Sequence, residues 1–246
     1  MKSQLYTLLK REFKSYFQNP IGAIYISLYV FFSVLIAIQI GQLIEFNEAS
    51  LYSFFEFQPY ILLLFVPALG MRIWSEDNKS GTIDVLLSLP IKDYQLILGK
   101  YFASLLICLI ALIACIPLWI SINFLGKADN FIALGGFISC LMIASIYLVI
   151  SMAISMVTKN QIIAYLISLL FGFLFLASGM PIVINMLDGI GFNLGNLFAQ
   201  ISLLDDFENM IIGQFSYSAI IKFILIIGFG LYINFEFLKL KRWGHI

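Results

Sequence analysis

The glycine–lysine pairs are the first candidates for chemistry, because a phosphate-binding P-loop ends in Gly-Lys followed by Ser or Thr. Neither pair is followed by Ser or Thr, because Tyr101 follows Gly99-Lys100 and Ala128 follows Gly126-Lys127. The one histidine, His245, is the next-to-last residue, so neither a zinc-protease motif nor a histidine-based catalytic triad can form around it. The sequence therefore predicts no catalytic residue and no nucleotide bound by this chain.

Candidate metal ligands are equally sparse. The cysteines all lie inside apolar runs, which favours small packing residues over a disulfide framework or a metal cluster: Cys108, Cys115 and Cys140. Acidic side chains gather at Asp205, Asp206 and Glu208, where a cation site is the alternative to a solvated surface at a helix start. We expect the solvated surface, and so no metal site.

The composition indicates that lipid is the solvent of this fold. Hydrophobic residues make up 61% of the 246 and charged residues only 11%, whereas a soluble domain carries about a quarter charged. The mean hydropathy is +0.99. We predict an all-α integral membrane protein in a single transmembrane domain with six spans. The predicted spans are residues 20–43, 54–74, 101–126, 131–157, 161–187 and 217–238, with residues 188–216 as an external loop.

The distribution of positive charge predicts the orientation. With the N-terminus inside, all but Lys127 and Lys222 of the 14 lysines and arginines fall on the cytoplasmic side. The positive-inside rule then places both termini in the cytoplasm of a multi-pass protein of the cell (inner) membrane, which requires an even number of spans. The net charge of zero gives no reason to expect a nucleic-acid partner.

Residues 1–19 are predicted to form an amphipathic helix on the membrane surface, in contact with the lipid bilayer. Glu12 falls on its apolar face and interrupts the pattern. The residues assigned to the surface contact are Lys10, Arg11, Phe13, Lys14 and Phe17.

A cytoplasmic segment, residues 75–100, mixes charged and apolar residues. Gly81 can reverse the chain direction, and Ser80 or Thr82 could cap a short helix that Pro90 would end. Its apolar face is predicted to consist of Ile83, Leu86 and Leu87. Such a helix suits the groove of a partner, and the alternative is a solvated loop that joins two spans.

Two blocks of residues carry a resemblance to a known family. The first consists of Pro67, Met71-Arg72, Ser75-Glu76, Ser80-Gly81-Thr82, Leu86-Leu87, Pro90 and Gly99-Lys100, and the second of Ile201-Ser202, Asp206-Phe207 and Gly213. Both resemble the type-2 ABC transporter permeases, especially the gliding-motility-associated and nitrous-oxide-reductase copper-processing branch. The resemblance covers the whole chain. Asp206 departs from it, because histidine is common at that position.

The resemblance implies a permease subunit that moves a substrate, in the direction of export, or transmits mechanical work across the membrane. It makes residues 75–100 the coupling segment for a cytoplasmic ABC ATPase, which would hold ATP and magnesium and perform the hydrolysis. The implied contact residues are Glu76, Ser80, Gly81, Thr82, Ile83, Asp84, Val85, Leu86 and Leu87. The implied assembly has two ATPases and a second permease, identical or paralogous, with an accessory extracytoplasmic protein as a further partner.

Two other classes of function compete with this one. A membrane enzyme would need polar groups gathered at one interface, but Glu45, Glu48 and Glu56 are scattered. A secondary transporter or channel would keep ionisable groups near the middle of its spans, and the predicted spans have none there. A neighbouring ATPase gene would distinguish the permease from both alternatives.

Overall fold

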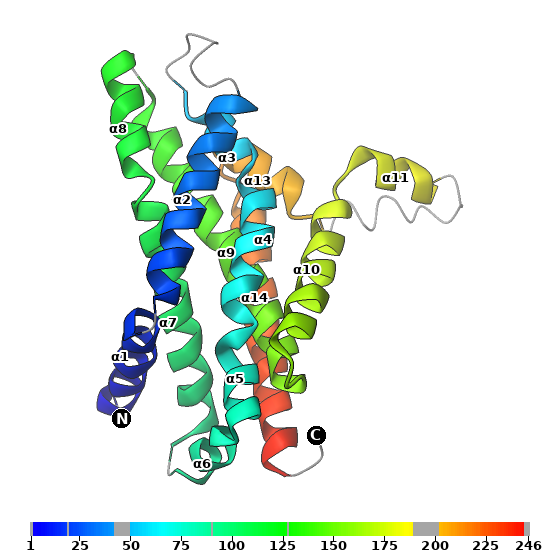
Figure 1. Ribbon diagram of the computed structural model, residues 1–246. Coiled ribbons are helices and arrows are strands. Elements are labelled where there is room, and N and C mark those ends of the chain that lie inside the picture. The colour runs from blue at the N-terminus through cyan, green and yellow to red at the C-terminus, as the bar shows by residue number, and fades with distance from the viewer. Residues whose placement is uncertain are drawn as a thin grey trace.

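The computed structural model describes residues 2–18, 20–41, 50–89, 91–126, 128–188 and 202–243, and every regular element in these ranges is an α-helix. Residues 189–201 of the predicted external loop lie outside the described residues, as do Glu45, Glu48, Pro90, Lys127 and His245. Within the described part of the chain, the helices form one elongated bundle (Figure 1).

In the described part of the chain, four helices, one of them counted across a kink, are long and apolar enough to cross a membrane: α2 (Ile21–Gln39), α7 with α8 (Asp93–Ile113 and Ile116–Leu125), α9 (Asn130–Val157) and α14 (Tyr217–Arg242). Two of them begin at strong N-caps. The Asp129 carboxylate accepts hydrogen bonds from two backbone N–H groups of α9, and the Ser216 hydroxyl accepts one from α14. The chain is therefore an all-α, multi-pass membrane protein.

The other two predicted spans are interrupted. Residues 54–74 fall in α3 (Tyr52–Glu56), α4 (Gln58–Gly70) and the start of α5 (Arg72–Ser80). Residues 161–187 fall in α10 (Gln161–Ala177) and α11 (Pro181–Asp188), and α11 turns away from the bundle (Figure 1). Six spans therefore stays a prediction.

Helix α9 is the centre of the bundle and packs against α4, α5, α7, α10, α14 and the short α13 (Leu204–Ile211). Small residues allow these close contacts. A Cβ atom added to Gly70 of α4 would lie 1.8 Å from the Ser151 Oγ of α9. Small residues on α7, on α9 and at the kink before α8 are buried: Ser104, Cys108, Ala111, Cys115, Cys140, Ala144, Ser151 and Ser155.

One end of the bundle, which we call the α6 end, carries both described chain termini and the short helix α6 (Thr82–Ser88), as Figure 1 shows. The predicted amphipathic helix is α1 (Lys2–Gln18), which packs against α7 at this end. The predicted segment 75–100 divides into the last part of α5, α6, and the first two turns of α7. The opposite end, with α3 and α13, is the α13 end.

Candidate functional site

Helix α1 lies against α7 at a glycine. Leu8 is buried there, and a Cβ atom on Gly99 would lie only 2.2 Å from the Leu8 Cδ2 atom. Further along both helices, the hydroxyls of Tyr16 and Ser104 are 2.8 Å apart. A side chain at position 99 would therefore force Leu8 to move.

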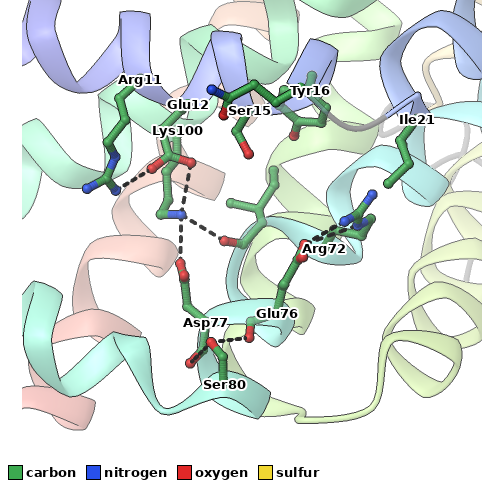
Figure 2. Close-up of a pocket in the computed structure, with 12 residues that line it drawn as sticks. Arg11, Glu12, Ser15, Tyr16, Ile21, Arg72, Glu76, Asp77, Ser80 and Lys100 are labelled. Atoms are coloured by element: carbon green, nitrogen blue, oxygen red, sulfur yellow. Dashed lines mark hydrogen bonds and ion pairs between the residues drawn. The ribbon is translucent and has the colours of Figure 1, made fainter.

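The next residue, Lys100, is the centre of an ionic cluster that joins three helices. Its side chain is only 5% exposed, and its Nζ lies 2.8 Å from the Asp77 Oδ2 of α5 and 3.3 Å from the Glu12 Oε2 of α1. The Nζ also donates to the Ile73 carbonyl at 3.0 Å and lies 5.0 Å from the centre of the Trp74 ring. Figure 2 shows the two ion pairs and the hydrogen bond, and we call these contacts together with the Trp74 ring the Lys100 cluster. Two carboxylates, a carbonyl and an aromatic face compensate the buried ammonium.

The Lys100 cluster continues into the first turn of α6. The Thr82 hydroxyl donates to the Asp77 Oδ1 at 2.9 Å, so this carboxylate bonds α7 through one oxygen and α6 through the other. The hydroxyls of Ser80 and Thr82 are 2.8 Å apart. Gly81 has a φ of 71°, the left-handed conformation in which glycine has no Cβ penalty. The direction change predicted at Gly81 is therefore present.

The other end of α6 is bonded to α14 and α7. The Arg242 guanidinium donates to the Leu87 carbonyl at 3.1 Å and lies 2.9 Å from the Asp93 carboxylate at the start of α7. Ile83 and Leu86 are 4% and 6% exposed and Leu87 is half-buried, so most of the predicted apolar face of α6 packs against its own chain. The coupling contact itself stays a prediction.

The free face of α6 is formed by other residues. Val85 is 62% exposed and Leu89, just after the helix, is 39% exposed, while Thr82, Asp84 and Ser88 are also exposed. We call these five residues the outer face of α6. Of the nine residues assigned to the coupling contact, Ile83 and Leu86 are inside the chain, and Val85 is the most exposed of the hydrophobic ones.

Asn78 joins α5 to the end of α9. Its Nδ2 donates to the Met156 carbonyl at 3.0 Å and to the Thr158 carbonyl at 3.3 Å, which are among the free carbonyls of a helix C-terminus. Its Oδ1 accepts from Lys241 of α14, whose Nζ also donates to the Met156 carbonyl at 3.1 Å. The ends of α5, α9 and α14 are thus bonded together beside α6.

A polar cavity of about 420 Å³ opens between α1, α5 and α7 (Figure 2). Its walls carry three basic and three acidic side chains: Arg11, Arg72, Lys100, Glu12, Glu76 and Asp77. They pair with one another, since Arg11 bonds Glu12 at 2.7 Å and Arg72 bonds Glu76 at 2.8 Å. Because the charges balance, the cavity does not favour a small ion of either sign.

The surface helix shows why Glu12 lies on the apolar side. Lys10, Arg11 and Lys14 are exposed, Phe13 is half-buried and Phe17 is 46% exposed. The apolar side of α1 faces α7 around Leu8, and Glu12, one turn later, meets Lys100 there. Glu12 is thus a bonding residue and not an interruption of the pattern.

Sequence reasoning missed Lys100, Glu12, Asp77, Asn78 and Arg242 as a connected set. Two signals for part of it were present: a carboxylate on the apolar side of α1, and a Gly-Lys pair at the start of a predicted span. Glu12 and Lys100 are 88 residues apart in the chain, so spacing alone could not pair them.

The second block of the resemblance lies at the α13 end. The Asp206 carboxylate of α13 pairs with the Lys222 Nζ of α14 at 2.5 Å, and Lys222 also donates to the Ser202 carbonyl at 3.0 Å. Phe207 is fully buried, and Gly213 has a φ of 86°. These residues hold α13 against the bundle. Asp205 and Glu208 are exposed, and the described residues contain no group of three His, Cys, Asp or Glu side chains that could hold a metal ion.

Comparison with known proteins gives a family but no individual relative. No curated protein matches the chain. A family model described as ABC-2 family transporter protein matches residues 6–227, from α1 through the first part of α14. This match includes the Lys100 cluster, α6 and the Asp206–Lys222 pair. With nearly the whole chain covered, this protein belongs to the ABC-2 family of transporter proteins and is a membrane subunit of an ABC transporter.

Proposed function

We propose that this chain is the permease subunit of an ABC exporter and that a separate cytoplasmic ATPase drives it through the outer face of α6. The observation that carries the proposal is the exposed Val85 on a short helix that is bonded directly to α5 and α14 and, through Asp77 and Lys100, to α1 and α7. A partner that displaces such a helix would also displace the helices bonded to it.

The bonds of α6 supply the mechanical part of the proposal. Through Asp77, the start of α6 is bonded to the Lys100 cluster and hence to α1 and α7. Through Arg242, its end is bonded to α14. A rigid-body displacement of α6 would therefore be passed to α1, α5, α7 and α14 together.

In this proposal the α6 end faces the cytoplasm, as the distribution of lysine and arginine predicts. Two permease subunits, identical or paralogous, form the pathway, and two ATPases hold ATP and magnesium. The permease itself hydrolyses nothing. The family match supports the permease role, while the direction of transport and the stoichiometry rest on the resemblance of the sequence.

The test is purification of the tagged full-length chain from its own cells in mild detergent, followed by measurement of bound ATPase subunit and of ATP hydrolysis. The wild-type complex is expected to hydrolyse ATP, and the isolated chain is not. Val85→Asp places a charge in the proposed contact, where burial without a partner costs several kcal/mol, so the ATPase should be lost. The matched control is Val157→Asp, at an exposed valine (51%) that ends α9.

Leu86→Asp is expected to behave differently, because Leu86 is buried within the chain. It should lower the yield of folded permease, whereas Val85→Asp should leave folding unchanged. If Val85→Asp retains the ATPase as well as the wild type does, the contact is not on the outer face of α6. If the wild-type chain binds no ATPase, the proposed function is wrong.

A further inference from the structure

Helices α7 and α14 form a groove at the α6 end of the bundle. Both belong to segments long and apolar enough to cross a membrane, and α7 begins at this end while α14 ends there (Figure 1). Three residues of each helix line the groove: Tyr94, Ile97 and Leu98 of α7, and Leu231, Tyr232 and Phe235 of α14. The groove is therefore apolar along two spans and lies next to the point where both spans leave the hydrocarbon.

Two lysines stand at the mouth of this groove. The Lys239 Nζ lies 4.2 Å from the centre of the Phe235 ring. The Lys92 Nζ lies 5.9 Å from the centre of the Tyr94 ring. Lys92 directly precedes α7 and Lys239 is in the last turn of α14, so both ammonium groups are at the same end of the groove. Tyr94 and Tyr232 are 41% and 59% exposed, as is typical of tyrosines at a membrane interface.

The charges around the mouth leave a positive excess. Lys239 pairs with Glu236 at 3.1 Å, and Arg242 pairs with Asp93 at 2.9 Å. Lys92 is exposed and forms no ion pair with any residue that the structure describes. Three cations and two carboxylates give a net charge of +1. The Lys239–Glu236 pair is exposed and contributes little stability, so Lys239 can also bond another anion.

The charge decides between a lipid and a second copy of this chain as the occupant. In a two-fold pair the same face meets itself, so the positive excess of one copy would oppose that of the other. A phospholipid instead places its phosphate where the spans meet water and its acyl chains along the apolar groove. Basic pockets between transmembrane helices bind anionic headgroups for this reason.

We propose that the groove between α7 and α14 binds one anionic phospholipid, with an acyl chain along Leu98 and Leu231 and the phosphate beside Lys92 and Lys239. The aromatic rings under the two ammonium groups hold the lysines at the mouth, where they face the headgroup. The site is independent of the ATPase contact and of the transported substrate.

The test is native mass spectrometry of the full-length chain in mild detergent, titrated with phosphatidylglycerol or with phosphatidylcholine of the same acyl chains. Saturable binding of one phosphatidylglycerol is expected, with much weaker binding of phosphatidylcholine. The double variant Lys92→Gln with Lys239→Gln should bind phosphatidylglycerol about 25-fold more weakly, because each lysine near an anionic headgroup strengthens binding roughly fivefold. The matched control, Lys79→Gln with Lys159→Gln, removes two exposed lysines from the same end and should bind as the wild type does.

The acyl chain is tested separately from the headgroup. Leu98→Trp and Leu231→Trp fill the groove from its two walls, and each should weaken the binding of phosphatidylglycerol. Leu166→Trp, at an exposed leucine (58%) on α10, is the control and should bind the lipid normally. Inorganic phosphate in excess should leave the lipid bound. Thermal unfolding of each variant in detergent shows that the protein remains folded.

Four results would overturn the proposal. The first is equal binding of the two lipids by the wild type, and the second is an equal loss of binding in the two lysine double variants. Displacement of the lipid by inorganic phosphate would mean that the mouth binds a free anion. An efficient disulfide between two copies of a Tyr232→Cys variant would mean that a second permease covers the groove.

Discussion

Two lysines, one at each end of the bundle, hold helices in place by different means. Lys100 at the α6 end has a 5% exposed side chain and bonds groups from both α1 and α5. Lys222 at the α13 end is 28% exposed and bonds Asp206 and the Ser202 carbonyl, which lie in α13 and just before it. The first lysine closes a three-helix junction, whereas the second attaches one short helix to one span.

The glycine turns at the two ends also differ, because one turn is open on its outside and the other is packed against a neighbour. Gly81 makes the turn into α6 with no neighbouring atom within 4 Å of a Cβ placed there. Gly213 makes the turn after α13 against Ile132, whose Cγ1 would lie 3.1 Å from such a Cβ. The turn at the α6 end is thus open on its outside, and the turn at the α13 end is packed. This difference suits an α6 end that receives a partner.

The comparison of the two ends predicts that Lys100→Met causes the largest loss of stability. The change leaves the Asp77 and Glu12 carboxylates, which are 21% and 18% exposed, without their shared cation. Breaking a buried ion pair from one side costs about 3–5 kcal/mol, so the thermal unfolding transition of the purified permease should fall markedly. Lys79→Met, at an exposed lysine on α5, is the control and should have almost no effect. Equal stability of the two variants would mean that the Lys100 cluster does not hold α1.

The corresponding change at the other end, Lys222→Met, should cost less. The Lys222 side chain is 28% exposed, against 5% for Lys100, so water can replace its ammonium beside Asp206, and the Ser202 carbonyl loses one hydrogen bond. Hydrogen bonds to charged groups contribute about 1.5–3 kcal/mol each, so a loss of about 2 kcal/mol is expected. Protease digestion should show the loss as easier cleavage near α13, with α1 unaffected. Cleavage at α1 instead would remove the distinction between the two ends.

The glycine turns give a smaller and more local test. Gly81→Ala meets no atom, so only the left-handed backbone opposes it, at a cost of about 1 kcal/mol. Gly213→Ala should cost more, because Ile132 must also move. Denaturant titration in detergent shows which of the two variants loses more stability. A larger loss of stability in Gly81→Ala would mean that the turn before α6 is packed against neighbours and is not open.

The all-α fold and the limits of three long helices could be predicted from the sequence. The predicted spans 131–157 and 217–238 correspond closely to α9 and α14, and 20–43 to α2, because a long uncharged run has few other structures available in lipid. The break between α4 and α5 at Met71 could not be predicted in the same way, since hydropathy does not report where a backbone turns. The predicted coupling segment did contain α6.

The candidate site was predicted only in part, for a physical reason. The position of α6 follows from local sequence, but which of its faces is free depends on what the rest of the chain covers. The helical period groups Ile83 with Leu86, and it does not say whether a partner or α6's own bundle buries them. The Lys100 cluster depends on contacts between helices distant in the chain, so it emerged only when α1, α5 and α7 were placed together.

The smallest predicted effect concerns the acidic surface of α13 and depends on pH. Partial burial raises the pKa of the Glu208 carboxyl above its ordinary value, and the negative charges of Asp205 and Glu56 raise it further. A raised pKa in the folded state means that folding favours the protonated form. The resulting stability is fully present below the ordinary glutamate pKa and is lost as the pH rises through the raised pKa of the folded protein.

Glu208→Gln, which is neutral at every pH, should therefore unfold at a slightly higher temperature than the wild type at pH 7. The two proteins should converge as the pH falls below the ordinary pKa of glutamate, because the wild-type carboxyl is then neutral as well. Asp84→Asn, which removes an exposed carboxylate from α6, is the control at the other end. If Glu208→Gln shows no advantage at pH 7, or an advantage that grows as the pH falls, the acidic residues of α13 do not repel one another as this arrangement requires.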